Sequence, residues 1–259
     1  MRFEGQTALL TGAARGIGKA IARKLASEGC YVEITDIDEK AIDTAVRGIN
    51  DEFPGFAGGS IMDVTDTLSI RQIVTKLKSE KVRIDILVNN AGANGKSWVV
   101  DLDEKLWQTI IQTNLTGTFL CSKAVLPGMI ENRKGRIVNV ASIAGKQGES
   151  AGSAYCSSKF GVIGFTQSLA LEVADKNVLV NAVCPGPIQT ELGELGINQD
   201  AALRGLDPDE FRQWFIDRTP FKRQGTVEQV ANMVAFIVSD ECDFTTGAAF
   251  NVNGGIIMH

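Results

Sequence analysis

The chain has 259 residues, and 26 Lys and Arg stand against 31 Asp and Glu, which gives a formal net charge of −5. This length can bury a hydrophobic core without disulfide or metal support, and the acidic balance argues against binding to nucleic acid or to anionic membranes. Because the single histidine is His259, the sequence also excludes a Ser-His-Asp triad, a Cys-His pair and a zinc site built from several histidines.

Short apolar runs alternate along the chain with segments of helical spacing, which is typical of a parallel sheet with helices on both faces. The apolar runs predict seven strands, near residues 6–10, 31–35, 59–62, 84–88, 136–140, 178–183 and 248–252. The segments between them predict helices over 16–28, 38–50, 66–80, 103–131, 152–175 and 226–239. No linker or repeat interrupts this series, so we expect one doubly wound α/β domain over residues 1–259.

Residues 189–224 break the rhythm of strands and helices. They follow the sixth predicted strand and hold an amphipathic piece with Phe211, Trp214 and Phe215, but no strand. Excursions of this length in a compact domain are usually lids or binding loops. We therefore expect a substrate-loop insertion here; a structural insertion that covers an apolar edge is the alternative.

A glycine-rich turn follows the first predicted strand. Residues 11–18 read TGAARGIG, and the first helical segment begins inside this turn. Gly12, Gly16 and Gly18 permit a tight turn and let a ligand approach the backbone at the positive end of a helix. The turn is therefore predicted to bind the pyrophosphate of a dinucleotide, with Arg15 and Ile17 beside it.

An acidic residue ends the second predicted strand, eighteen positions after the last glycine of the turn. A carboxylate at Asp36 can accept hydrogen bonds from both ribose hydroxyls and would repel a 2′-phosphate, so it favours NAD over NADP. Arg15 argues the other way, because a guanidinium in the glycine turn could pair with that phosphate. We give Asp36 more weight, since its repulsion acts where the extra phosphate would sit.

Further motifs follow the glycine turn in a fixed order. They are Asp63-Val64, Asn89-Asn90-Ala91-Gly92, Asn114, Ser142, Tyr155-x-x-x-Lys159 and Pro185-Gly186. Together with the turn, this ordered set resembles the short-chain dehydrogenase/reductase family, from Thr11 to the C-terminus. The resemblance implies a Rossmann-type domain whose seven-stranded parallel sheet has the order 3-2-1-4-5-6-7.

Tyr155 is the candidate acid/base, because no usable histidine exists. A free phenol titrates near pH 10, and Lys159 lies on the same helical face, where its ammonium is expected to lower that pKa. Ser142 ends the fifth strand and can orient the substrate oxygen against Tyr155. By resemblance to the family, Lys159 also binds the nicotinamide ribose, and Asn114 holds a water that links this lysine to solvent.

The resemblance extends the cofactor site along the carboxyl edge of the sheet. It places Ile188 and Thr190 against the nicotinamide and Asp63-Val64 near the adenine. The expected cofactor-binding residues are Gly12, Arg15, Gly16, Ile17, Gly18, Asp36, Ile37, Asp63, Val64, Asn90, Ala91, Gly92, Tyr155, Lys159, Pro185, Gly186, Ile188 and Thr190.

The substrate is expected to contact three loops: residues 93–98, 143–154 and 189–224. The middle loop is strongly polar, which favours a small hydroxylated or charged substrate over a steroid or a long acyl chain. Lys96 or Lys146 could bind an anionic group of such a substrate, although solvated lysines are the default.

These features and the amino-acid sequence of the C-terminal third resemble those of the family's polyol, sugar-alcohol and diol dehydrogenases. We therefore expect hydride transfer between NAD(H) and a small polar secondary alcohol or ketone. An NADP-dependent 3-oxoacyl-thioester reductase of the same family is the alternative. A nucleotide-binding regulator without turnover is a more distant alternative, because relatives of that kind typically lack the tyrosine or the lysine, and Tyr155 and Lys159 are both present.

The sequence also gives expectations for the assembly and the cellular location of the protein. Five widely spaced cysteines without a C-x-x-C pair indicate reduced thiols and no metal site. No stretch approaches 18 apolar residues, so we expect a cytoplasmic protein with a small-molecule substrate and no membrane or nucleic-acid partner. Small residues at Gly161, Gly164 and Ala170 favour pairing of helix 152–175 with a second copy, and the family resemblance implies a homodimer or homotetramer.

Overall fold

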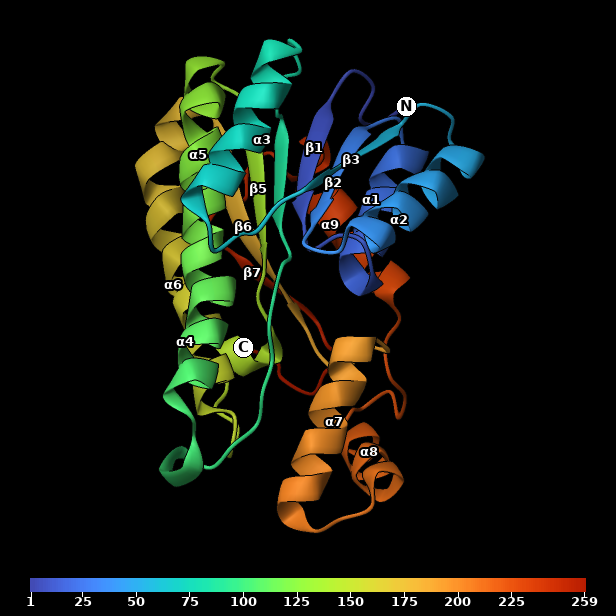
Figure 1. Cartoon of the computed structure of the whole chain (residues 1–259), viewed down its shortest axis with the longest axis vertical. Coiled ribbons are helices and arrows are strands. Elements are labelled where there is room, and N and C mark those ends of the chain that lie inside the picture. The colour runs from blue at the N-terminus through green and yellow to red at the C-terminus, as the bar shows by residue number, and fades with distance from the viewer.

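The computed structural model describes residues 1–259, and all of its strands belong to one parallel sheet (Figure 1). The sheet order is β3-β2-β1-β4-β5-β6-β7, which confirms the expected doubly wound topology. The strands are β1 Thr7–Thr11, β2 Tyr31–Asp36, β3 Ala57–Ile61, β4 Ile86–Asn89, β5 Gly135–Val140, β6 Val178–Pro185 and β7 Ala249–Val252.

Helices cover both faces of the sheet. They are α1 Gly16–Ser27, α2 Glu39–Glu52, α3 Thr67–Ser79, α4 Glu104–Ile111, α5 Gly117–Glu131, α6 Ser153–Val173, α7 Glu191–Arg204, α8 Pro208–Asp217 and α9 Val227–Ile237. Helices α1, α2 and α9 enclose one core and α3, α5 and α6 the other, on opposite sides of the strands (Figure 1). Successive residues of β1 alternate between the two cores, as Leu9 and Leu10 do. Apolar runs in the sequence therefore correspond to strands buried on both faces.

The predicted helix over 103–131 is divided in the structure. A π-helical turn, Gln112–Thr116, separates α4 from α5. Its middle residue, Asn114, is buried and donates from Nδ2 to the Ala93 carbonyl at 3.0 Å, while its Oδ1 accepts from the Ala93 amide at 2.7 Å. The extra residue of a π turn turns this side chain toward the loop after β4. Apolar spacing continues through the turn, so periodicity alone could not reveal it.

Residues 189–224 form a helical pair that projects beyond the carboxyl ends of the strands (Figure 1). The Thr190 hydroxyl accepts from the Gly193 amide at 3.0 Å and caps α7, and Gly205 ends this helix with φ +66°. Phe211 of α8 packs against Ile197 and Ala201 of α7 in a small core of its own. The excursion is thus a local unit, called the lid below.

Two further properties of the chain follow from burial and helix composition. All five cysteines are free and buried. No helix combines the length and the apolar character that crossing a membrane requires.

Candidate active site

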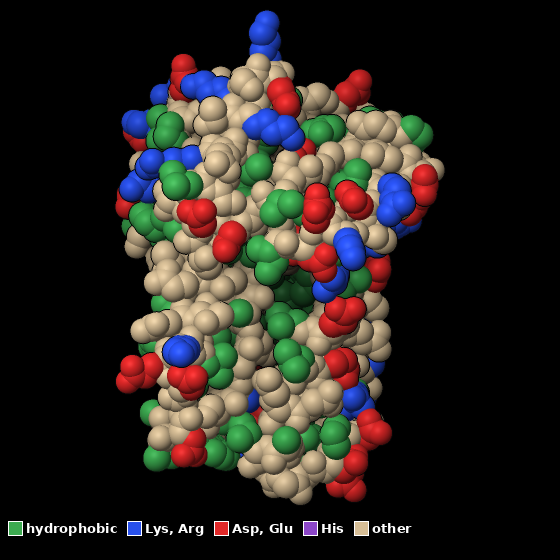
Figure 2. Space-filling model, viewed as in Figure 1, with side chains coloured by type: hydrophobic (Ala, Val, Ile, Leu, Met, Phe, Trp, Pro, Cys, Tyr) green, Lys and Arg blue, Asp and Glu red, His purple; other side chains and the backbone are tan.

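A cleft of about 1570 Å³ runs along the carboxyl edge of the sheet, from the glycine turn to the lid. Figure 2 shows this face of the molecule hollowed between the sheet and the lid, with hydrophobic side chains around the hollow. The cleft is lined by every expected cofactor-binding residue except Gly18, and also by Ser142. Residues chosen from separate motifs thus share one cavity, at the edge where doubly wound sheets bind ligands.

The glycine turn has the geometry of an anion cradle. Gly12 has φ +58°, and a Cβ there would lie 2.6 Å from the Ala91 Cα, so no larger residue fits. Gly18 does not line the cleft, because it packs against Asn90, whose Nδ2 would lie 2.5 Å from an added Cβ. Helix α1 begins at Gly16 without a side-chain cap, unlike α2, α3 and α4. Its free amides suit a pyrophosphate, so the turn fits a dinucleotide.

Asp36 is held where the adenosine ribose of a dinucleotide would be recognised. Its Oδ1 accepts from the Ile37 amide at 2.8 Å, and its Oδ2 lies 3.4 Å from the Ala14 amide. Arg15, which argued for NADP, forms an ion pair with Asp38 at the start of α2. The Arg15 guanidinium and the Asp38 carboxylate are therefore engaged with each other beside the cleft.

The catalytic candidates meet in the middle of the cleft. Tyr155 and Lys159 lie on α6, and the Lys159 ammonium sits 5.6 Å from the centre of the Tyr155 ring. Lys159 Nζ donates to the Val140 carbonyl at 2.8 Å, which ties α6 to the end of β5. Ser142 follows β5, and its hydroxyl accepts from the Ala144 amide at 3.1 Å. The structure thus brings Ser142, Tyr155 and Lys159 together.

Burial controls the protonation of this group. It raises the pKa of Tyr155 to about 12, although the interaction with the Ser142 hydroxyl acts in the opposite direction. Burial also lowers the pKa of Lys159 to about 8. The sequence predicted that Lys159 would lower the phenol pKa, whereas in the folded protein desolvation outweighs its neighbours. We therefore expect Tyr155 to carry its proton at neutral pH.

Asn114 lies behind the cleft wall. Besides its bonds to Ala93, its Nδ2 donates to the Ser158 hydroxyl at 2.9 Å. A Cβ on Gly92 would lie 3.5 Å from Asn114 Oδ1 and 3.9 Å from Lys159 Nζ, so both side chains lie close to this glycine. Asn114 thus shapes the loop that faces Lys159, and its expected water relay stays a prediction.

Sequence reasoning missed part of the lining of the cleft. Gln108 and Gln112 line it from α4 and the π turn, and Leu192 and Leu195 line it from α7. None of them belongs to a motif; only the long excursion indicated that residues near 192 would matter.

The polar loop before Tyr155 does not line the cleft at all. Lys146 donates to the Ala249 carbonyl at 2.8 Å, and Glu149 accepts from Lys96 at 2.6 Å. The polar groups of the loop are therefore engaged in contacts within the chain. Its composition does not describe the substrate surface, which includes Ile197 and Phe215 of the lid.

With a nucleotide cradle and a Ser-Tyr-Lys group in one cleft, the structure defines a dinucleotide-dependent oxidoreductase. The profile of one family, described as "Enoyl-(Acyl carrier protein) reductase", matches residues 12–257. The chain belongs to the short-chain dehydrogenase/reductase family, whose fold binds a nicotinamide cofactor.

Individual relatives refine this assignment. The chain is 39% identical to the 3-oxoacyl-[acyl-carrier-protein] reductase of Escherichia coli over 258 residues, all of both chains. It superimposes on an actinorhodin polyketide ketoreductase with NADPH at TM-score 0.93 and 37% identity, over 97% of each chain. It is 32% identical to an NAD⁺-bound xylitol dehydrogenase at TM-score 0.95, over 98% of this chain and 100% of the other.

The expected polyol, sugar-alcohol or diol dehydrogenase activity is wrong on these findings. Bacterial relatives that match over essentially the full chain at 37–40% identity are 3-oxoacyl-[acyl-carrier-protein] reductases. The physical reason for the error is the polar loop, whose side chains bond within the protein and leave a partly apolar substrate end.

Proposed function

We propose that the protein reduces 3-oxoacyl thioesters to 3-hydroxyacyl thioesters with a reduced nicotinamide dinucleotide. The observation that carries this proposal is the position of Ser142, Tyr155 and Lys159 in the same cleft as the dinucleotide cradle, where the phenol of half-buried Tyr155 can deliver a proton to a ketone oxygen. The full-length relatives support the acyl substrate. Leu192, Leu195 and Phe215 supply apolar surface for an acyl chain.

Three residues of the chain would have separate roles in the reduction of the ketone. When bound, the dinucleotide supplies the hydride that reaches the 3-oxo carbon. The Ser142 hydroxyl donates a hydrogen bond to the ketone oxygen and holds it against Tyr155. Tyr155 transfers its phenolic proton to that oxygen as negative charge develops there, leaving a phenolate. The neighbouring Lys159 ammonium stabilises this phenolate until a proton returns.

We further propose that NADH is preferred over NADPH. A 2′-phosphate would meet the Asp36 carboxylate, and the Arg15 guanidinium that could neutralise it is paired with Asp38. Replacing Asp36→Ala removes the repulsion and is expected to reduce the NADH preference by about tenfold or more, equivalent to about 1.4 kcal/mol. Asp38→Ala frees Arg15 and should act in the same direction; a preference that neither variant changes would refute this assignment.

The exposed faces of α5 and α6 support assembly with a second copy. Phe119, Phe160 and Leu171 are exposed on these helices. Of the three small residues singled out, Gly164 faces open space, whereas Gly161 packs against Leu115 and Ala170 is buried in the core. We propose that this face pairs two subunits, and light scattering of Leu171→Glu at several concentrations would test it.

The reaction itself is tested by following oxidation of NADH and, separately, NADPH with acetoacetyl-coenzyme A and a 3-oxoacyl pantetheine. We expect turnover with both thioesters and a higher kcat/KM with NADH. A protein that binds either dinucleotide but turns over neither thioester would contradict the proposed function.

A further inference from the structure

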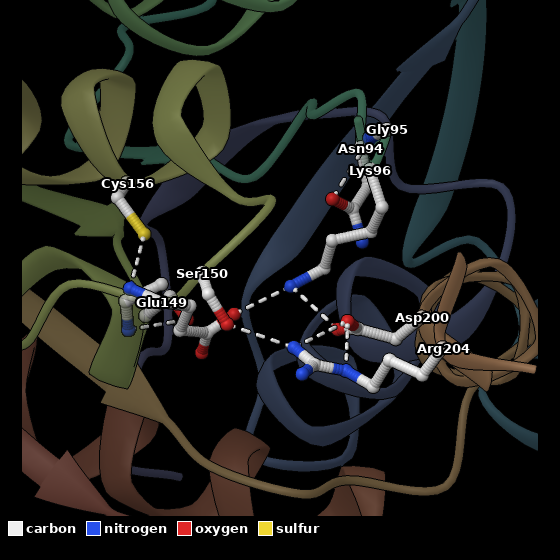
Figure 3. A network of polar contacts seen from close by, with 10 residues as sticks. Asn94, Gly95, Lys96, Glu149, Ser150, Cys156, Asp200 and Arg204 are labelled. Carbon is white, nitrogen blue, oxygen red and sulfur yellow. Dashed lines mark hydrogen bonds and ion pairs between the residues drawn. The ribbon is translucent and has the colours of Figure 1, made fainter. Parts of the chain in front are cut away.

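A partly buried ion network joins the lid to the two loops beside the catalytic tyrosine (Figure 3). Lys96, in the loop after β4, contacts Glu149 Oε2 at 2.6 Å and Asp200 Oδ2 at 3.0 Å. Arg204, one turn after Asp200 on α7, contacts Asp200 Oδ1 at 3.1 Å and donates to the Ser150 hydroxyl at 2.8 Å. Three segments far apart in the sequence therefore meet at Lys96.

The network is electrically balanced and partly shielded from water. The Lys96 side chain is only 6% exposed and Asp200 only 11%, whereas Glu149 and Arg204 are 30% and 31% exposed. Burial disfavours the Lys96 charge, but Glu149 and Asp200 more than offset this and raise its pKa. Two cations and two carboxylates thus neutralise one another. The Lys96 ammonium is occupied by its two carboxylate partners, so it is not available to bind an anionic substrate. Removing Lys96 would leave the Glu149 carboxylate without its ion-pair partner and Asp200 with Arg204 alone.

Aromatic rings close the network on the Arg204 side. The guanidinium carbon lies 5.8 Å from the centre of the Trp98 ring and 5.7 Å from that of Phe211. Arg204 thereby links the loop after β4 to α8 as well as to α7. The Ser97 amide donates to the Ala151 carbonyl at 2.9 Å, which joins the two loops to each other.

The network lies just beyond the substrate end of the cleft. Ile197 lines the cleft less than one turn before Asp200, and Asn94 lines it two residues before Lys96. A Cβ on Gly196 would lie 2.8 Å from Asn94 Nδ2, so α7 already packs closely on this loop. None of the four charged residues lines the cleft. They join α7 to the two loops behind the wall of the cleft.

We propose that Lys96 is a specificity-determining residue, which seals the substrate end of the cleft by pinning α7 to the loop before Tyr155 and so limits the length of the acyl chain. This inference rests on the proposed function for the identity of the substrate. The sealing of the lid itself does not depend on it.

The test begins with a readout that needs no substrate. Lys96→Met keeps much of the side-chain length and removes the charge, so amide hydrogen exchange of residues 191–204 should become about tenfold faster or more, as local opening costs less. Lys96→Arg should restore most of the protection. Lys176→Met, which breaks an exposed pair with Asp175, is the matched control and should leave the lid unchanged.

The second readout is kcat/KM for short, medium and long 3-oxoacyl thioesters. We expect the wild-type protein to favour short chains and Lys96→Met to reduce that preference by about tenfold or more. If Lys96→Met misfolds, the variant that combines it with Glu149→Gln removes the carboxylate left without a partner, keeps the Asp200–Arg204 pair and tests the same point.

The possible outcomes separate the two claims. Unchanged exchange in Lys96→Met overturns the pinning of α7, and faster exchange with an unchanged length profile overturns the role in specificity. If the wild-type protein reduces no thioester, the proposed function and the length limit fail together, while the exchange result still decides whether Lys96 holds the lid.

Discussion

The two ends of the cleft are built in different ways. At the dinucleotide end, the backbone makes the site, through a positive φ at Gly12, an uncapped helix α1 and the carboxyl edge of the sheet. At the lid end, side chains from distant segments make it, and Lys96 contacts the Glu149 carboxylate 53 residues away and the Asp200 carboxylate on α7. The first kind of site tolerates few residue types and leaves a pattern in the sequence. The second leaves almost none, because many pairings could close a lid equally well.

The largest expected effect is at the point where the two ends meet. Tyr155→Phe removes the proposed proton donor but keeps the ring, so we expect kcat to fall by about 10²–10⁴-fold. Dinucleotide binding, measured by fluorescence titration, should remain within a few-fold of wild type. A variant with near-normal turnover would show that another group donates the proton.

A glycine substitution should break the dinucleotide end alone. In Gly12→Ala the new Cβ would lie 2.6 Å from the Ala91 Cα at an unfavourable φ, so we expect the free energy of unfolding to fall by about 1–3 kcal/mol and dinucleotide binding to weaken. Gly48→Ala on α2, where nothing lies within 4 Å, is the matched control and should gain about 0.5–1 kcal/mol. Equal effects at both positions would argue against a cradle at Gly12.

The pH dependence sharpens the description of the catalytic centre. Burial lowers the pKa of Lys159 from 10.5 to about 8, so kcat for ketone reduction should decline as pH rises through about 8 and the ammonium is lost. Lys159→Met should be slow throughout and lack this step.

Stability should respond to the same group with the opposite sign. Between about 8 and 10.5 the unfolded chain binds the Lys159 proton and the folded chain does not, so this lysine makes the protein more stable as pH rises through that window. Denaturant titrations of the wild-type protein and Lys159→Met across this range would reveal the difference, and parallel curves would contradict it.

The smallest expected effect lies within the lid. Arg212 of α8 contacts Glu194 of α7 at 2.7 Å, with the two side chains 28% and 38% exposed. Such partly solvated pairs contribute about 0–1 kcal/mol, so Arg212→Ala should change the midpoint of urea unfolding only slightly. If Arg212→Ala lowers this midpoint as much as Lys96→Met does in the same titration, exposed contacts contribute as much to holding the lid as the Lys96 network.

The sequence predicted the strands and the glycine turn because each depends on local chemistry, whereas the sheet order and the rest of the cofactor site came from the family resemblance. Strands buried on both faces must be apolar, and a pyrophosphate needs glycines before a helix, as at Gly12 and Gly16. The substrate could not be predicted in the same way. The composition of residues 145–150 is polar whether Glu149 faces a ligand or, as found, Lys96. The π turn at Asn114 was likewise invisible, because it depends on a contact with Ala93.

The buried cysteines make the chain convenient for site-directed labelling. Burial raises the pKa of Cys30 and of Cys121 to about 12, and also raises those of Cys156 and Cys184. A maleimide dye reacts with exposed thiolate, so the native thiols should stay unmodified while the protein is folded. A single cysteine introduced at exposed Leu206 would then carry one fluorophore on the tip of the lid and report its movement directly.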